Sequence, residues 1–203
     1  AVYQAPAKIE AALVLDNSWS MDGARMDALR SAANTFVSTV VTNNDDTVRV
    51  GIVPFNNFVN VGLSNKTASW INVPPSYTGD GWGCTVDEPA SKALGCSKTT
   101  STCYNDGDPY SCDQWTCPSG KSLVQSCPKV TYSWYGCVRS RTPPLDIEDR
   151  NYVSEKVPGH LTENDWGCPS AILPMTSSVS KLNAAISAMK AESETYIATG
   201  LSW

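Results

Sequence analysis

Apolar residues near the start of the chain follow two different periods. Residues 9–15 are almost wholly apolar, which is typical of a buried strand in a parallel sheet. Residues 48–55 form a second run of the same kind. Between them, over residues 23–42, apolar side chains recur at three- and four-residue steps and predict one face of an amphipathic helix. That face comprises Met26, Leu29, Ala33, Phe36 or Val37, and Val40. We therefore expect a strand–helix–strand unit with parallel strands.

Turn residues separate these elements from one another. Asn43, Asn44, Asp45 and Asp46 are expected to end the helix. After the second strand, residues 56–57 are both Asn and predict a tight turn into residues 58–61, a short hairpin partner at a sheet edge.

A second periodic stretch lies near the end of the chain. Residues 172–176 are expected to return the chain to the sheet, and Thr176 or Ser177 to cap a helix. The apolar face of that helix comprises Val179, Leu182, Ala185 or Ile186, and Met189. A further helix is expected to begin near Ile197.

Residues 64–170 lack helical periodicity and are rich in Gly, Pro, Ser, Thr and aromatic side chains. All eight cysteines of the chain lie here: Cys84, Cys96, Cys103, Cys112, Cys117, Cys127, Cys137 and Cys168. An even number of closely spaced cysteines predicts disulfides. Zinc is the alternative, but the chain has one His, His160, and no Cys-x2-Cys pair. The pairing stays open.

This contrast predicts two parts. Residues 1–63 and 171–203 would form a partial α/β domain, and residues 64–170 a disulfide-rich, irregular insertion. Short strands are expected near Val124 and over residues 130–132. Most of the ten aromatic residues of the insertion are expected to fill a thin core; a binding surface is the alternative. The ten aromatic residues are Trp70, Tyr77, Trp82, Tyr104, Tyr110, Trp115, Tyr132, Trp134, Tyr135 and Trp166.

Composition narrows the function. The chain is 41% hydrophobic and 17% charged, as expected of a globular protein, and its net charge is −5. The chain has no basic stripe, which argues against a nucleic-acid partner. No apolar run approaches the roughly 20 residues of a membrane span. Residues 1–7 have no basic segment of an export signal, so we expect any signal or anchor to lie upstream or to have been removed. The cysteines favour the periplasm, the cell surface or secretion.

Candidate chemistry follows the first strand directly. Asp16, Ser18 and Ser20 alternate in the loop at its carboxyl end, where open α/β sheets bind ligands. Alternation can direct three oxygens to one point, and Mg²⁺, Mn²⁺ and Ca²⁺ all prefer oxygen ligands. The alternative is that Asp16 and Ser18 only cap the helix or close a turn.

The Asp-x-Ser-x-Ser sequence resembles the opening of the metal-ion-dependent adhesion site of von Willebrand factor A (vWA) domains. Thr195 is similar to the second motif of that site, a Thr in a loop just before a helix. The closest resemblance is to the vWA-containing tight-adherence (Tad) pilus-assembly proteins of bacteria, which are anchored in the membrane near their N-terminus. It rests on residues 48–55, 167–169, 172–176 and 198–203.

The resemblance implies a Rossmann-like open sheet flanked by helices. It also implies a divalent cation held by Asp16, Ser18, Ser20 and Thr195, whose shell is completed by an acidic side chain of a protein partner. Any membrane attachment would then use a segment outside this chain.

The sequence departs from the family at three places. Trp19 stands where a small residue is usual, Glu194 and Tyr196 flank Thr195 where Gly and Asn are common, and the Asp of the third motif is absent. Glu192, Glu194 or Asp22 is expected to supply the missing charge.

The sequence supports one alternative function and argues against another. A sheet that stopped here would leave a strand edge unpaired, so we expect either a processed fragment or a second chain that completes the sheet. The alternative function is therefore a structural or filament subunit that associates through this edge. We expect no enzyme activity. An aspartyl phosphotransferase usually has an acid where Ser18 stands, and no nucleophile-elbow sequence lies near His160.

Overall fold

Two long parallel strands form the centre of the larger unit in the computed structural model, which describes residues 8–42, 45–148 and 150–203. Strand β1 (Ile9–Asp16) pairs with β2 (Val48–Phe55) over its whole length, from Ile9 opposite Val48 to Asp16 opposite Phe55. The near-continuous apolar run of β2 is explained by its burial, since its last six residues are buried.

The other edge of β2 is shared by two antiparallel strands. Strand β12 (Leu173–Thr176) pairs along the first half of β2, and β3 (Phe58–Asn60) pairs where β2 ends. The sheet continues from β3 through β10 (Lys129–Arg139) and β11 (Val157–Glu163) to β4 (Ile71–Asn72). The protein is therefore mixed α/β, with parallel and antiparallel pairs in one sheet.

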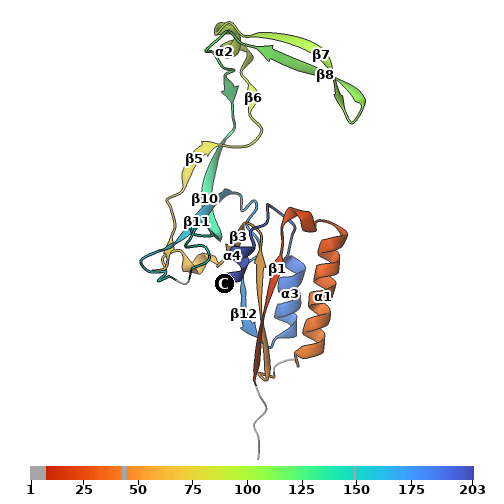
Figure 1. Ribbon diagram of the computed structural model, residues 1–203, viewed down its shortest axis with the longest axis vertical. Helices are drawn as coiled ribbons and strands as arrows, with labels where there is room; N and C mark the ends of the chain where they lie inside the picture. Colours follow the sequence, from red (N-terminus) through yellow and green to blue (C-terminus); the bar gives the residue numbers. More distant parts are fainter. Residues whose placement is uncertain (1–7, 43–44, 149) are drawn as a thin grey trace, which may run out of the picture. The chain divides into compact units, whose positions relative to one another are not determined.

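Helices α1 (Ala24–Val40) and α3 (Val179–Ala188) pack side by side against one face of β1 and β2 (Figure 1). Their apolar stripes and the strands enclose one core, which includes Leu15, Met26, Val37, Val50, Ile52, Leu182, Ile186 and Met189. A second core surrounds β3, β10 and β11, and includes Val53, Phe55, Val59, Ile71, Trp134, Val138 and Val157.

A short helix packs near the carboxyl ends of β1 and β2. Helix α4 (Ile197–Leu201) contacts β1, β2 and β3. Gly200 permits this contact, because a Cβ atom there would lie 2.5 Å from Cγ of the buried Phe55 ring. Two short 3₁₀ helices complete the unit, η1 (Trp19–Met21) and η2 (Leu63–Asn65). None of the helices in the described residues is long and apolar enough to cross a membrane.

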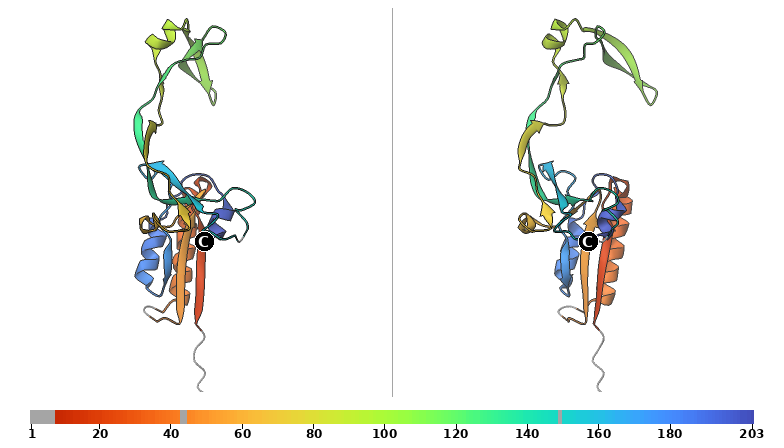
Figure 2. Two further views of the ribbon diagram at one scale, coloured as in Figure 1. Left: turned by 90° about the vertical axis from the view of Figure 1, so that its left-hand side faces the viewer. Right: turned by 60° about the vertical axis from the view of Figure 1, so that its left-hand side comes forward.

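Residues 78–131 form a separate compact unit. The chain leaves the larger unit along β5 (Tyr77–Asp80) and returns along β10. Between them lie β6 (Thr85–Val86), α2 (Glu88–Ala93) and β9 (Gln125–Ser126). Strands β7 (Ser97–Asn105) and β8 (Asp108–Thr116) form a two-stranded antiparallel ribbon (Figure 2).

Disulfides replace a large core in this smaller unit. A lone two-stranded ribbon is marginally stable in water, and small units with little apolar burial rely on such links. Three disulfides lie here: Cys84–Cys127, Cys96–Cys117 and Cys103–Cys112. The fourth, Cys137–Cys168, lies in the larger unit. The predicted disulfides are thus confirmed, and the zinc alternative fails because no cysteine is free.

The predicted strands at residues 9–15 and 48–55, the helix between them and the short antiparallel partner are confirmed with small shifts at their ends. The partner was wrongly placed at a sheet edge, because β3 pairs with β2 on one side and with β10 on the other. The cap of the late helix was predicted wrongly. Ser178 is its N-cap, and the hydroxyl of Thr176 instead accepts a hydrogen bond from the Ser178 amide at 3.1 Å. The turn expected at residues 43–46 lies partly outside the described residues.

The middle of the chain differs more from expectation. The compact unit is residues 78–131 rather than 64–170, because β10, β11 and β4 pair into the main sheet. The insertion was predicted to be irregular, but it contains a short helix, α2, which Asp87 caps by accepting a hydrogen bond from the Ala90 amide. The aromatic residues do not mostly fill a core. Trp134 is buried, but five of the ten are exposed: Tyr77, Trp82, Tyr104, Tyr110 and Trp166.

Candidate functional site

The loop after β1 brings the three predicted ligands together. The backbone amide of Ser18 donates to Oδ1 of Asp16 at 2.8 Å, which turns the chain sharply at the strand end. The next residues form η1, so the side chains of Ser18 and Ser20 fall on the same side of the loop. Their hydroxyl oxygens lie 3.1 Å apart. One carboxylate and a pair of neighbouring hydroxyls therefore lie in the same loop at the carboxyl end of the parallel strand.

The three candidate ligands differ in their exposure to solvent. Ser20 is exposed, Asp16 is partly buried, and Ser18 retains 1% of its accessible surface. Arg25, in the first turn of α1, donates from Nη1 to the carbonyl of Ser20 at 2.6 Å. The contact fixes the end of the loop, but it also places a guanidinium beside the cluster. A positive charge there disfavours a bound cation.

A second loop is joined to the first through backbone hydrogen bonds. The Trp19 amide donates to the carbonyl of Ser193 at 2.7 Å, and the Glu192 amide donates to the carbonyl of Asn17 at 2.8 Å. The side chain of Asn56, in the turn after β2, donates to the carbonyl of Glu192 at 2.8 Å. The segment that carries Thr195 thus lies at the same end of the sheet as the Asp16 loop.

Thr195 itself does not join the cluster directly. It is exposed, and its hydroxyl has no hydrogen-bond partner within the described part of the chain. The acids expected to supply a further charge have other roles. Glu192 accepts from the Gly167 amide at 3.1 Å, and Glu194 accepts from Nδ2 of Asn57 at 3.2 Å. Asp22, the third of them, is exposed.

The bulky Trp19 is accommodated because its ring lies outside the turn. It is 61% exposed and meets Trp166 edge to face, with 6.4 Å between the ring centroids. The departure from a small residue at this position therefore does not prevent the loop from closing. It adds a pair of exposed aromatic rings beside the candidate ligands.

Two buried polar side chains near the loop lack a partner among the described residues. Neither amide atom of Asn17 is hydrogen bonded, and nor is the hydroxyl of Thr199 in α4. Leaving such a group without a partner costs about 1–3 kcal/mol, so each has unused capacity for water or another polar ligand. Asn17 lies between two of the predicted ligands, where bound water would accompany an ion.

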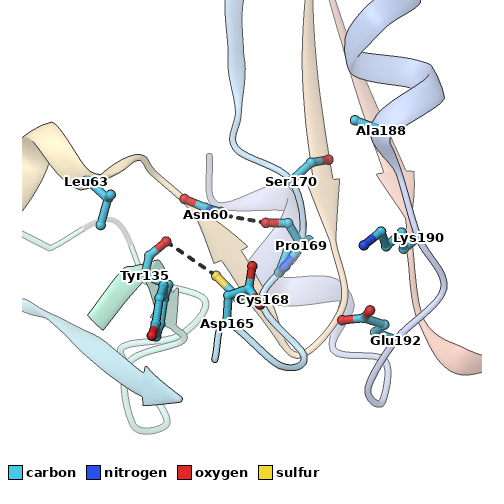
Figure 3. Close-up of a pocket in the computed structure, with 10 residues that line it drawn as sticks. All are labelled: Asn60, Leu63, Tyr135, Asp165, Cys168, Pro169, Ser170, Ala188, Lys190 and Glu192. Carbon is cyan, nitrogen blue, oxygen red and sulfur yellow. Dashed lines mark hydrogen bonds between the residues drawn. The ribbon is translucent and has the colours of Figure 1, made fainter. Parts of the chain in front are cut away.

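Glu192 also lines a pocket of about 380 Å³ (Figure 3). Lys190 and Glu192 line one side of it, and Leu63 and Tyr135 the other (Figure 3). The Cys137–Cys168 disulfide holds the adjoining loop against β10. This mixture of charged and apolar walls suits a side chain of a protein partner better than a purely apolar ligand.

The donor set fits a hard divalent ion in part. Adjacent ligands of an octahedral Mg²⁺ lie about 3.0 Å apart when each ligand is about 2.1 Å from the metal. The 3.1 Å between Ser18 Oγ and Ser20 Oγ agrees with that spacing. Among the described residues, no group of three or more His, Cys, Asp and Glu side chains is arranged to hold a metal ion. Any ion would therefore depend on hydroxyls and water around one carboxylate.

His160 has an environment unlike that of a general base. Its ring stacks on Phe58, with 4.0 Å between centroids. Burial, followed by the charge of Arg139, lowers the pKa of His160 to about 4. The imidazole is therefore neutral at pH 7.

Comparison of the chain with protein-family models, with curated proteins and with solved structures gave no match.

Proposed function

We propose that this chain is an extracytoplasmic protein-binding module of the vWA type, related to the Tad pilus-assembly proteins. In this proposal a divalent cation, Mg²⁺, Mn²⁺ or Ca²⁺, is held by Asp16, Ser18 and Ser20, with Thr195 as a further ligand. An acidic side chain of the partner completes the coordination shell. The ion supplies an electrophilic centre for that carboxylate, so the role is recognition rather than catalysis.

The main support is that Asp16, Ser18 and Ser20 lie in one hydrogen-bonded loop at the carboxyl end of β1, with the two hydroxyls 3.1 Å apart. The two hydroxyls are within hydrogen-bond distance of each other, and their separation of 3.1 Å also suits neighbouring ligands of one ion. The order of strand, helix, parallel strand and short antiparallel strand supports the vWA type. Four disulfides support an oxidising compartment.

Two exposed tryptophans beside the loop support a protein partner. Large aromatic side chains are enriched among residues that dominate binding energy at interfaces. Trp19 and Trp166 are both more than half exposed and contact each other, so they present one continuous aromatic surface. A partner that placed a carboxylate on the ion would cover these rings at the same time.

The test is Mn²⁺ binding, measured by electron paramagnetic resonance on matched variants. Asp16→Asn keeps an oxygen acceptor for the Ser18 amide but removes the charge, and it is expected to weaken Mn²⁺ binding about tenfold or more. Asp27→Asn removes an exposed charge from α1 and is expected to change it by less than about twofold. Equal Mn²⁺ affinities of the Asp16→Asn and Asp27→Asn proteins would show that Asp16 does not bind the ion.

A second candidate function is association through β1. Among the described residues β1 pairs only with β2, so its other edge has unpaired amides and carbonyls along eight residues. Such an edge can accept a strand from another polypeptide. A sedimentation experiment separates the candidates, because a concentration-independent monomer excludes self-association through this edge.

A further inference from the structure

A groove of about 670 Å³ crosses the strands β3, β10 and β11 of the larger unit. Arg139 and Arg141, both at the end of β10 or just beyond it, line this groove. The stacked rings of Phe58 and His160 form part of its wall. No Asp or Glu is among the described residues that line it.

Neither arginine has a carboxylate partner among the described residues. Arg141 is 7% exposed, and its Nη1 has no hydrogen-bond partner within the described ranges. Its Nη2 donates to the carbonyl of Glu148 at 2.7 Å, and its guanidinium lies 4.3 Å from the ring centroid of Tyr152. Arg141 is thus a fixed and nearly buried cation held by neutral groups.

Two acids accept hydrogen bonds from neutral groups that line the groove. Asp146 accepts from the hydroxyl of Tyr196, and Glu194 accepts from the amide of Asn57. Tyr196 and Asn57 both line the groove. Both carboxylates lie outside the described lining of the groove, in which the charged side chains are those of Arg139 and Arg141. A nearly buried charge without a counter-ion costs free energy, which an incoming carboxylate would recover.

We propose that this groove binds an acidic segment of a protein partner, with a carboxylate on the guanidinium of Arg139. Arg139 is exposed and can form the two parallel hydrogen bonds that arginine makes with a carboxylate. The positive charge of Arg141 makes the electrostatic potential in the groove more positive without contacting the carboxylate directly. The flat Phe58–His160 pair supplies an apolar surface for the methylene groups of a glutamate. This contact needs no metal and is separate from the Asp16 loop.

The test uses a fluorescent hexaglutamate peptide, with hexaglutamine as the uncharged control, in a buffer of low ionic strength containing EDTA. Binding of hexaglutamate but not of hexaglutamine is expected. Arg139→Glu should weaken binding about tenfold or more, because it removes the charge-assisted pair. Arg150→Glu makes the same charge change at an exposed arginine outside the groove, and should weaken binding less than about twofold.

Two further measurements decide the location and the ligand class. A carboxylate near Arg139 should raise the pKa of His160 from about 4 towards its ordinary value, which nuclear magnetic resonance would detect. Inorganic phosphate should compete only weakly. Equal loss of binding in the two arginine variants, an unchanged His160 pKa, or phosphate binding tighter than hexaglutamate binding would each overturn the proposal. Because EDTA is present throughout, failure here leaves the metal proposal unaffected.

Discussion

The backbone amide of Trp19 donates to the carbonyl of Ser193 at 2.7 Å, although the two residues lie near opposite ends of the sequence. With the bond from Glu192 to Asn17, this contact ties the two loops that carry the candidate ligands. Backbone contacts do not depend on side-chain identity. The two loops can therefore keep their shape when a ligand side chain is replaced, so a change in ion affinity reports on that side chain.

Replacement of Arg25 by Gln should strengthen Mn²⁺ binding. The guanidinium of Arg25 lies beside the ligand cluster and repels a cation, by an amount that salt reduces. An increase of about two- to fivefold is expected at low ionic strength, and a smaller one at high salt. Arg49→Gln, which removes an arginine paired with Glu10 at the amino end of β1, is the control. A decrease for Arg25→Gln would mean that its hydrogen bond to Ser20 matters more than its charge.

Removal of the Cys137–Cys168 disulfide should destabilise the larger unit. The two residues are 31 apart in sequence, and closing a loop of that length restricts the unfolded chain by about 3–4 kcal/mol. The double substitution to Ala is therefore expected to lower the free energy of unfolding by a comparable amount. Hydrogen exchange of the β1 and β2 amides would measure it.

The Cys103–Cys112 disulfide provides the comparison. It links the β7–β8 ribbon within the smaller unit, which contributes nothing to the cores around β2. Its replacement by Ala should leave exchange of the β1 and β2 amides nearly unchanged. Similar losses for both double substitutions would show that the two units unfold together.

Gly200→Ala should displace α4 from the sheet. The new Cβ would lie 2.5–2.9 Å from three atoms of the buried Phe55 ring, and overpacking of this kind costs about 1–3 kcal/mol. Chemical denaturation would measure the loss. Adding Phe55→Leu removes ring atoms from the clash, so the second change should cost less in the Gly200→Ala protein than in the original one. Additive losses would contradict the close approach of α4 to β2.

His160 should make stability depend on pH on the acid side of neutrality. Its pKa is about 4 in the folded protein, against an ordinary value of 6.5. The unfolded chain therefore binds the proton first as the pH falls, and the folded state loses stability between pH 6.5 and 4. Because the ring is partly exposed, we expect a loss of about 1 kcal/mol. His160→Gln should remove that part of the slope, and an identical pH profile would contradict the assignment.

The sequence predicted the elements whose pattern is local. The apolar run of β1, the helical periodicity of α1 and the run of β2 are each contained in a short window, and all three are present. Helix α2 also had a local signal, Asp87 followed by Glu88 and Pro89, which the surrounding turn-rich composition concealed. The pairing of β10 and β11 with the main sheet was missed, because it depends on residues far apart in the chain.

The same distinction applies to the candidate sites. Asp16, Ser18 and Ser20 could be grouped from the sequence, since alternation in one loop brings their oxygens together. The Arg139 groove could not be predicted, because its walls come from three strands, the turn after β2, residues 140–143 and Tyr196. Sequence also could not show that Glu192 and Glu194 bind neighbouring loops.

The position of a bound ion tests the central claim most directly. Crystals of the protein soaked in Mn²⁺ should show an anomalous peak within coordinating distance of Ser18 Oγ, Ser20 Oγ and the Asp16 carboxylate. The peak should disappear in Asp16→Asn crystals treated in the same way. A map with no peak at this loop would contradict the proposed metal site.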